Sequence, residues 1–350
     1  MQPNIASSAV LRRNSLVNNR LAGFSKRKIS AVEVLYTRCR YITCLEQYVV
    51  ILQALFIKEI WYTHLMLNYF QAIIFGALQG VTELFPISSL GHSVILPKLL
   101  NWNINQKDPF FLTFLVATHA ATALVLFFFF WKDWKRIITG VIRSLKEREI
   151  SHTDTDAKLG WLLILGTIPA GILGLLFEDT LKGLFADPQL VSGILILNGI
   201  MLFTAEKLGN NNRKGKEESS DKRIAKLTWN QTLKVGLLQC IALIPGFSRT
   251  GATITGGLLV ELSHKDAARF SFLLATPIIG AAAVLKLPEL LTKTAIQHMG
   301  PTLVGAITAG IFAYISVKFL LKYFEKQKLT PFAFYCVLIG VLLSLVFLGR

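Results

Sequence analysis

Apolar residues gather along this chain in six long runs separated by polar connections. The runs cover residues 109–131, 159–177, 189–205, 266–287, 299–321 and 331–348. A helix needs about 20 mainly apolar residues to cross the roughly 30 Å of hydrocarbon in a bilayer. The pattern therefore predicts an all-α integral membrane protein with six transmembrane helices.

Composition and charge agree with this prediction. Only 17% of the residues are charged and the mean hydropathy is +0.51, whereas about 25% are charged in a typical soluble domain. The net charge is +16, but basic side chains concentrate in connections 132–158 and 206–230, with seven each, against one each in 178–188 and 288–298. Because positive connections stay cytoplasmic, the first pair is predicted inside and the second outside. No basic patch matches phosphodiester spacing with interleaved aromatic residues, so we expect no nucleic-acid partner.

Residues 1–65 precede this pattern and are predicted to lie outside a single membrane domain of residues 66–350. Residues 1–40 hold eight Lys or Arg side chains and one acid, a composition similar to that of a transit peptide. Met66 stands in a natural start position. A mis-assigned start or dispensable extension, a targeting segment and an extra signal-anchor helix are the interpretations left open.

Two polar segments interrupt the apolar pattern and resemble each other. The first is LQGVTELFPISSLGH (78–92) and the second is LLQCIALIPGFSRTGATITGGLL (237–259). Aligning their glutamines also pairs two serines and two glycines: Gln79 with Gln239, Ser88 with Ser248 and Gly91 with Gly251. Three predicted spans follow each segment, so the second copy enters from the opposite side of the membrane, as in the inverted repeats of transporters.

The repeat halves are predicted at about 66–205 and 231–350. Both polar segments contain Pro and Gly within apolar surroundings. Irregular backbone at membrane depth is tolerated only where it is buried in protein or lines a water-filled cavity. We therefore expect two re-entrant helical hairpins, one from each face, whose polar tips meet near the middle of the bundle.

The second segment carries the donors of an anion site. An arginine inside a membrane costs about 3 kcal/mol or more and indicates function, and the guanidinium of Arg249 suits a phosphate or a carboxylate. Hydroxyls of Ser248, Thr250 and Thr253 flank it. A helix beginning near Gly251 would add its positive N-terminal end. We expect a phosphate cradle; the alternative is that Arg249 pairs with a buried acid.

The first segment supplies reactive groups. Gln79 and Glu83 are four residues apart and share one helix face, and they are followed by Ser88, Ser89 and His92. A hydroxyl and an imidazole this close can act as nucleophile and acid–base partner. Glu83 is expected to be a base, an orienter of His92 or a ligand for a divalent cation that bridges a phosphate.

Plainer alternatives stay open for the same residues. Glu83 would then form a salt bridge with Arg249, and His92 would be a packed core histidine. His119, which stands alone on the 109–131 run, is interpreted as structural. The whole cluster favours a site for a lipid phosphate or pyrophosphate, with hydrolytic equipment, inside a membrane bundle.

The two segments closely resemble the signature motifs of the undecaprenyl-diphosphatase family, the bacitracin-resistance membrane phosphatases. The similarity covers about residues 66–350 and includes FSFLLATPIIGAA, which begins at Phe270. It implies hydrolysis of undecaprenyl diphosphate to undecaprenyl phosphate and inorganic phosphate. That reaction recycles the carrier lipid of peptidoglycan synthesis and confers bacitracin resistance. The resemblance also implies a multi-pass protein of the bacterial plasma membrane whose active site opens toward the outer face.

The resemblance implies a role for each motif residue. Those expected to be catalytic are Glu83, Ser89, His92 and Arg249. Those expected to bind the substrate are Gln79, Ser88, Ser248 and Thr253. Glu83 is also the expected ligand of a divalent cation, Mg or Ca. The family accepts both Gln and Glu at position 79, and the Gln found here weakens a two-carboxylate metal site.

A transporter or flippase for a polyprenyl phosphate is the rival hypothesis, supported by the inverted repeat through analogy of fold alone. The combination of Ser89, His92 and Glu83 favours the enzyme, because moving a phosphate needs no nucleophile. A structural scaffold would leave Arg249 and Glu83 unexplained. The expected partners are a polyprenyl diphosphate substrate and membrane lipids, and a homodimer is left open.

Overall fold

The computed structural model describes residues 67–106, 108–177, 187–209, 219–286, 288, 292, 296 and 298–349. The interpretations of residues 1–65 lie outside this part of the chain. Within the described residues the regular elements are helices and no β-strand is present. The all-α prediction is therefore confirmed.

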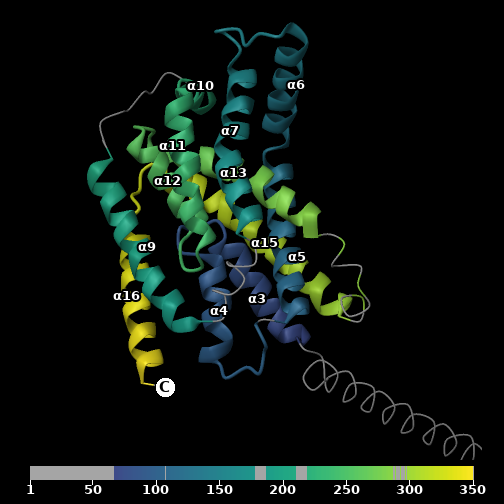
Figure 1. Ribbon diagram of the computed structural model, residues 1–350, viewed down its shortest axis with the longest axis vertical. Helices are drawn as coiled ribbons and strands as arrows, with labels where there is room; N and C mark the ends of the chain where they lie inside the picture. Colours follow the sequence, from purple (N-terminus) through teal and green to yellow (C-terminus); the bar gives the residue numbers. More distant parts are fainter. Residues whose placement is uncertain are drawn as a thin grey trace, which may run out of the picture. The chain divides into compact units, whose positions relative to one another are not determined.

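Six helices of the described part are long and apolar enough to cross a membrane (Figure 1). They are α5 (Pro109–Phe129), α7 (Thr155–Leu176), α9 (Pro188–Leu208), α13 (His264–Lys286), α15 (Met299–Tyr323) and α16 (Thr330–Leu348). Polar caps fix where α5 and α9 begin, because Asp108 and Asp187 accept backbone N–H groups just ahead of a proline. The six predicted spans are confirmed, with ends that differ by a few residues.

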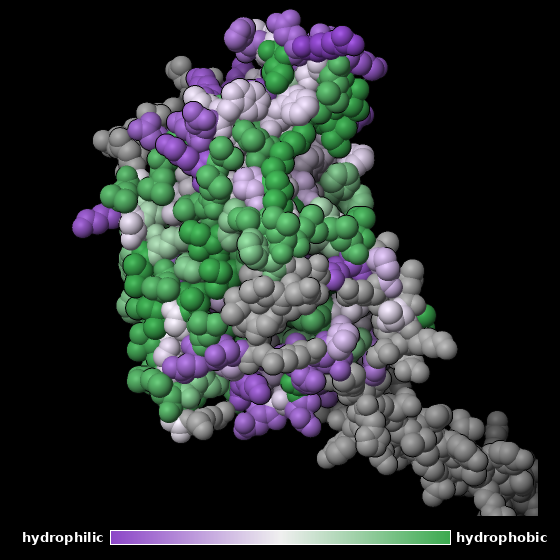
Figure 2. Space-filling model, in the orientation of Figure 1, coloured by the Kyte–Doolittle hydropathy of each residue, from purple (hydrophilic) through white to green (hydrophobic). Residues whose placement is uncertain are grey.

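The surface agrees with a membrane-spanning bundle. Figure 2 shows a broad apolar band with hydrophilic side chains gathered above and below it. The helices α6 (Trp131–Glu147) and α10 (Ser220–Ala225) lie together at the upper end in Figure 1. Both belong to the basic connections that charge alone predicts to be cytoplasmic. The described parts of the two connections thus lie at one end of the bundle, as the prediction requires.

Each polar segment forms short helices joined by a break. The first contains α3 (Tyr69–Thr82) and α4 (Ser89–Leu99). The second contains α11 (Trp229–Gln239), the 3-10 turn η1 (Cys240–Leu243) and α12 (Arg249–Leu259). These α-helices have 11 to 14 residues, which is too short to cross the hydrocarbon. The segments do not add spans, and their re-entry into the membrane stays a prediction.

Matching caps support the alignment of the two segments. Ser88 Oγ accepts the backbone N–H of Gly91 at 3.2 Å, and Ser248 Oγ accepts that of Gly251 at 3.1 Å. The first helices also begin alike, because α3 and α11 each start with a capping box. The two serines paired by the sequence alignment therefore have the same local role, because each caps the helix that follows it. The division into two repeat halves stays a prediction that these caps support.

Small residues let two helix pairs approach closely around the polar segments. Gly80 of α3 lies against Ala309 of α15, and Gly199 of α9 lies against Ala333 of α16; a Cβ at either glycine would overlap the neighbouring backbone. Such small-residue contacts are a common basis of helix packing in membranes. These crossings fix the helices that carry the polar residues described next.

Candidate active site

Four side chains converge on the carboxylate of Glu83, which follows α3 directly and is 5% exposed. Gln79 Nε2 donates to it at 3.0 Å and Ser89 Oγ at 2.5 Å. Arg249 forms an ion pair with it through Nη2, and His119 Nε2 lies 3.2 Å from Oε2. We call these five residues the Glu83 cluster. Its members come from both polar segments and from the spanning helix α5.

The backbone between the short helices turns sharply to place these groups. Ser88 has a φ of 71°, which is uncommon for a residue with a side chain, and Gly246 has a φ of 107°, which suits glycine. Past these turns, α4 begins at Ser89 and α12 begins at Arg249. Both N-terminal ends therefore lie at the Glu83 cluster. Free N–H groups and the helix dipole favour an anion at such ends.

Direct hydrogen bonds tie the second segment to the first. Thr250 Oγ1 donates to the backbone carbonyl of Glu83 at 2.8 Å, and Ser248 Oγ donates to that of Phe85 at 3.4 Å. Glu83, Ser248 and Thr250 are buried. The sequence prediction that the two polar tips meet is consistent with these contacts.

The other two predicted substrate-binding hydroxyls, those of Ser88 and Thr253, also have partners within the protein. Ser88 Oγ caps α4. Thr253 Oγ1 lies 2.5 Å from Ser271 Oγ and donates to the carbonyl of Arg249 at 2.9 Å. Neither hydroxyl is hydrogen-bonded to the carboxylate of Glu83, so their role toward a substrate stays a prediction.

His92 contacts residues outside the Glu83 cluster. Its Nδ1 lies 2.6 Å from the carbonyl oxygen of Ser88, and its Nε2 lies 2.8 Å from Tyr335 Oη on α16. The two rings are stacked with centroids 5.8 Å apart. Both ring nitrogens are thus engaged, and the expected orientation of His92 by Glu83 is not observed. Its acid–base role stays a prediction.

His119 is the imidazole that contacts Glu83, a contact that the sequence did not predict, and its interpretation as a structural residue stays a prediction. Its Nδ1 lies 2.7 Å from the carbonyl of Leu115 on the same helix. A carbonyl can only accept, so Nδ1 donates there, and Nε2 donates to the carboxylate when the imidazole carries a proton on both nitrogens. The available signal was the polar group of Thr118, His119 and Thr122 within an otherwise apolar run.

Asn198 joins the two segments and was also missed. It is fully buried on α9. Its Nδ2 donates to the carbonyl of Pro86 at 3.0 Å, and its Oδ1 accepts the backbone N–H of Ser248 at 3.0 Å. An amide within a transmembrane run is a recognisable signal, because such groups hydrogen-bond across helices. Asn198 therefore fixes both breaks relative to each other.

The salt bridge between Glu83 and Arg249 is the plainer alternative that the sequence left open, and it is present. Removing one partner of a buried pair leaves an uncompensated charge, at a cost of about 3–5 kcal/mol. A phosphate at the same place would share the guanidinium with the carboxylate. The pair thus fixes the position of the guanidinium beside Glu83.

The predicted divalent cation has few candidate ligands beside Glu83. No group of three or more His, Cys, Asp or Glu that could hold a metal ion is found in the described residues. Beside Glu83, however, Gln79 Oε1 is buried without a hydrogen-bond partner among them. One carboxylate and one amide oxygen fit a hard cation if phosphate oxygens complete its coordination.

The fold and the Glu83 cluster define a polytopic membrane protein with a buried polar site where two interrupted helical segments meet. A family model described as bacitracin resistance protein BacA matches residues 72–342. The chain belongs to this family.

Curated relatives agree over most of the chain. An undecaprenyl-diphosphatase of Mycolicibacterium paratuberculosis is 42% identical over 293 residues, which cover 78% of this chain and 95% of the relative. Undecaprenyl-diphosphatase 2 of Chromobacterium violaceum is 42% identical over 279 residues, covering 79% and 97%. An undecaprenyl-diphosphatase of Acidiphilium cryptum is 41% identical over 278 residues, covering 77% and 95%. The resemblance found in the sequence motifs is confirmed.

Proposed function

We propose that this protein hydrolyses undecaprenyl diphosphate to undecaprenyl phosphate and inorganic phosphate, and that it thereby recycles the carrier lipid of peptidoglycan synthesis and confers bacitracin resistance. Family membership and the names of the relatives support this activity. The observation that carries it is the convergence of a hydroxyl, a guanidinium and an imidazole on one buried carboxylate.

Substrate binding is assigned to the positive groups around Glu83. The guanidinium of Arg249 presents paired donors that suit a phosphate. The N-terminal ends of α4 and α12 add free N–H groups at the same place. Gln79, Ser88, Ser248 and Thr253 are proposed to complete the substrate contacts.

Ser89 is the proposed nucleophile or the hydroxyl that positions a water. Its Oγ donates to Glu83 at 2.5 Å, so the carboxylate is placed to take a proton as the oxygen attacks the terminal phosphorus. A new P–O bond then forms and the bridging P–O bond breaks. The bridging oxygen leaves on undecaprenyl phosphate, and His92 is proposed to supply its proton.

If Ser89 itself attacks, a water must next release the phosphate from the serine. His92, which gave up its proton in the first step, is proposed to take a proton from this water, while Glu83 returns its proton to Ser89 Oγ as the serine P–O bond breaks. If a water attacks, phosphate leaves in one step. Both routes have the same products. A Mg or Ca ion, held by Glu83 and Gln79, would supply positive charge against the phosphates.

The site is proposed to open toward the outer face of the bacterial plasma membrane. The basic connections at one end of the bundle support this orientation, because they identify that end as cytoplasmic. The lipid substrate would reach the site from within the bilayer. A homodimer is the proposed assembly.

Phosphate release from undecaprenyl diphosphate by the full chain in detergent tests the function. The parent should release phosphate, and Arg249→Ala should lose at least about 100-fold in kcat/KM, as expected when a charged transition-state contact is removed. Thr204→Ala is the control, because that hydroxyl lies on the exposed side of α9. No release by a folded parent, with or without divalent cations, would contradict the proposal, and movement of polyprenyl phosphate across vesicles would then favour a transporter.

A further inference from the structure

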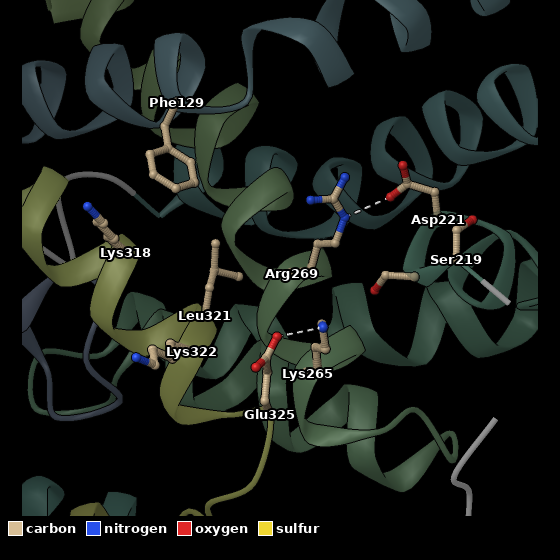
Figure 3. A pocket seen from close by; sticks show the side chains of 10 residues that line it. Phe129, Ser219, Asp221, Lys265, Arg269, Lys318, Leu321, Lys322 and Glu325 are labelled. Carbon is tan, nitrogen blue, oxygen red and sulfur yellow. Dashed lines mark hydrogen bonds and ion pairs between the residues drawn. The ribbon is translucent and has the colours of Figure 1, made fainter. Parts of the chain in front are cut away.

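A cavity lined by charged side chains lies apart from the Glu83 cluster. It has a volume of about 620 Å³ and is formed by residues of α5, α10, α13 and α15 and of the stretch just before α10. Figure 3 shows the side chains that surround it. No member of the Glu83 cluster lines it. The proposed phosphatase reaction therefore does not account for this cavity.

The cavity is lined by more positive than negative side chains. Its four cations are Lys265, Arg269, Lys318 and Lys322, and its two carboxylates are Asp221 and Glu325. Both carboxylates are already engaged, as the dashed lines in Figure 3 show: Arg269 Nε donates to Asp221 at 2.7 Å, and Lys265 Nζ donates to Glu325 at 2.7 Å. An anion entering the cavity would thus meet cations whose charge is not fully balanced.

Lys318 and Lys322 supply that unbalanced charge. They lie four residues apart near the end of α15 and so share one face of the helix. Both are exposed, and neither has a salt bridge within the described part of the chain. Like charges four residues apart on a helix repel each other slightly, and an anion bound beside both would relieve the repulsion.

The position of the pair along α15 points to a lipid. Ile311, Ile315 and Phe319 are each more than half exposed and follow one another at four-residue spacing on this apolar span. This apolar stripe leads to Lys322 at the end of the helix, and Phe129 and Leu321 line the cavity beside it. An acyl chain fits the stripe and a phosphate fits the ammonium groups at its end, because lysine side chains reach from the hydrocarbon edge to the headgroups.

The far wall of the cavity identifies the membrane face. Ser219, Ser220 and Asp221 belong to the basic connection 206–230, which charge predicts to be cytoplasmic. Basic pockets between helices on that side bind anionic headgroups in other membrane proteins. We propose that this cavity binds the phosphate headgroup of an anionic glycerophospholipid from the cytoplasmic leaflet, with Lys318 and Lys322 as its main contacts.

Lipid retention measured by native mass spectrometry tests the site. The full chain in neutral detergent is titrated with phosphatidylglycerol and, separately, with phosphatidylcholine. The structure predicts saturable binding of phosphatidylglycerol that is weakened roughly tenfold or more in Lys318→Gln/Lys322→Gln, because each charge near the surface contributes to headgroup attraction. The control is Lys132→Gln/Lys135→Gln, which removes two exposed cations of α6 that do not line the cavity.

Three outcomes would overturn the proposal. Equal retention of phosphatidylglycerol in both double variants would show that the cavity lysines are not its contacts. Equal binding of phosphatidylcholine would show that the negative headgroup is not selected. Glycerol 3-phosphate binding as tightly as the lipid would assign the cavity to a soluble phosphate instead. Thermal midpoints in neutral detergent verify that both variants are folded, and the readout does not depend on phosphate release.

Discussion

Side chains from both polar segments contact the carboxylate of Glu83. It accepts from Gln79 and Ser89 and pairs with Arg249 and His119. Groups that share one buried carboxylate are coupled, so changing one of them alters the position of the others. Effects of single substitutions here should therefore exceed those of ordinary buried hydrogen bonds.

His119 is expected to act by positioning Glu83. His119→Ala should lower kcat for phosphate release by roughly 10- to 100-fold, since it removes a donor from Oε2 of Glu83. His119→Gln keeps an N–H donor and should recover part of the loss, with little change in KM. The measurement is steady-state phosphate release by the parent and the two variants; full activity of His119→Ala would exclude the positioning role.

The sequence was informative about single residues where polar groups cluster along the chain. It predicted Gln79, Glu83, Ser89 and Arg249 because they stand close together within two unusual segments. It missed His119 and Asn198 because each stands on a long apolar run, far in sequence from the residues that it contacts. Which side of a spanning helix faces a neighbour depends on packing, and one sequence does not specify that packing.

Among the elements, α9 holds the two breaks together through one amide. Asn198 contacts the carbonyl of Pro86 and the N–H of Ser248. The helices α4 and α12 each begin with a serine cap, Ser88 and Ser248, that follows a break in the backbone. Helix lengths and breaks could be predicted from Pro, Gly and hydropathy, whereas the link through α9 required the structure.

Asn198→Leu should destabilise the protein. The apolar side chain has a similar size but leaves the buried N–H of Ser248 without its partner, at a cost of about 1–3 kcal/mol. It also leaves the carbonyl of Pro86 with only the thiol of Cys336, at 3.9 Å. A lower thermal midpoint in detergent, together with weaker phosphate release, is expected. Thr204→Val on the exposed side of α9 serves as the control, and equal midpoints for the two variants would contradict the bridging role of Asn198.

The short helix α10 is attached to the bundle by Asp221. Its carboxylate accepts from Arg269 at 2.7 Å and from Arg136 at 2.9 Å. Although burial alone would raise the pKa of Asp221, its hydrogen bonds and ion pairs with Arg269 and Arg136 hold that pKa below its ordinary value. The ionised carboxylate is therefore favoured in the folded protein, and its contribution to stability depends on pH.

Because the folded pKa is depressed, this contribution is present above the unfolded pKa of about 3.9 and is lost as pH falls through the folded value. Asp221→Asn should thus have a lower thermal midpoint than the parent at pH 7. The difference between the two proteins should stay constant down to about pH 5 and shrink below about pH 4. A difference that grew on acidification would contradict the assignment.

At the scale of the whole bundle, polar side chains gather in two places: the buried Glu83 cluster and the charged helices α6 and α10. The Glu83 cluster is enclosed by both segments and by spanning helices, whereas the charged helices α6 and α10, which belong to the basic connections, lie at one end of the bundle (Figure 1). Hydropathy and charge were enough to predict the six spans and which connections share one end. They could not predict the cavity between α13 and α15, because it depends on how distant helices pack.

The central claim is that Glu83 is the acceptor around which the phosphatase site is built, and Glu83→Gln tests it most directly. This variant keeps the size of the side chain but removes the negative charge that Ser89 and Arg249 contact. Phosphate release from undecaprenyl diphosphate should be measured for the parent and the variant in the same detergent, with folding verified by thermal midpoint. We predict a loss of at least about 100-fold in kcat. A folded Glu83→Gln protein that releases phosphate at the parent rate would contradict the claim.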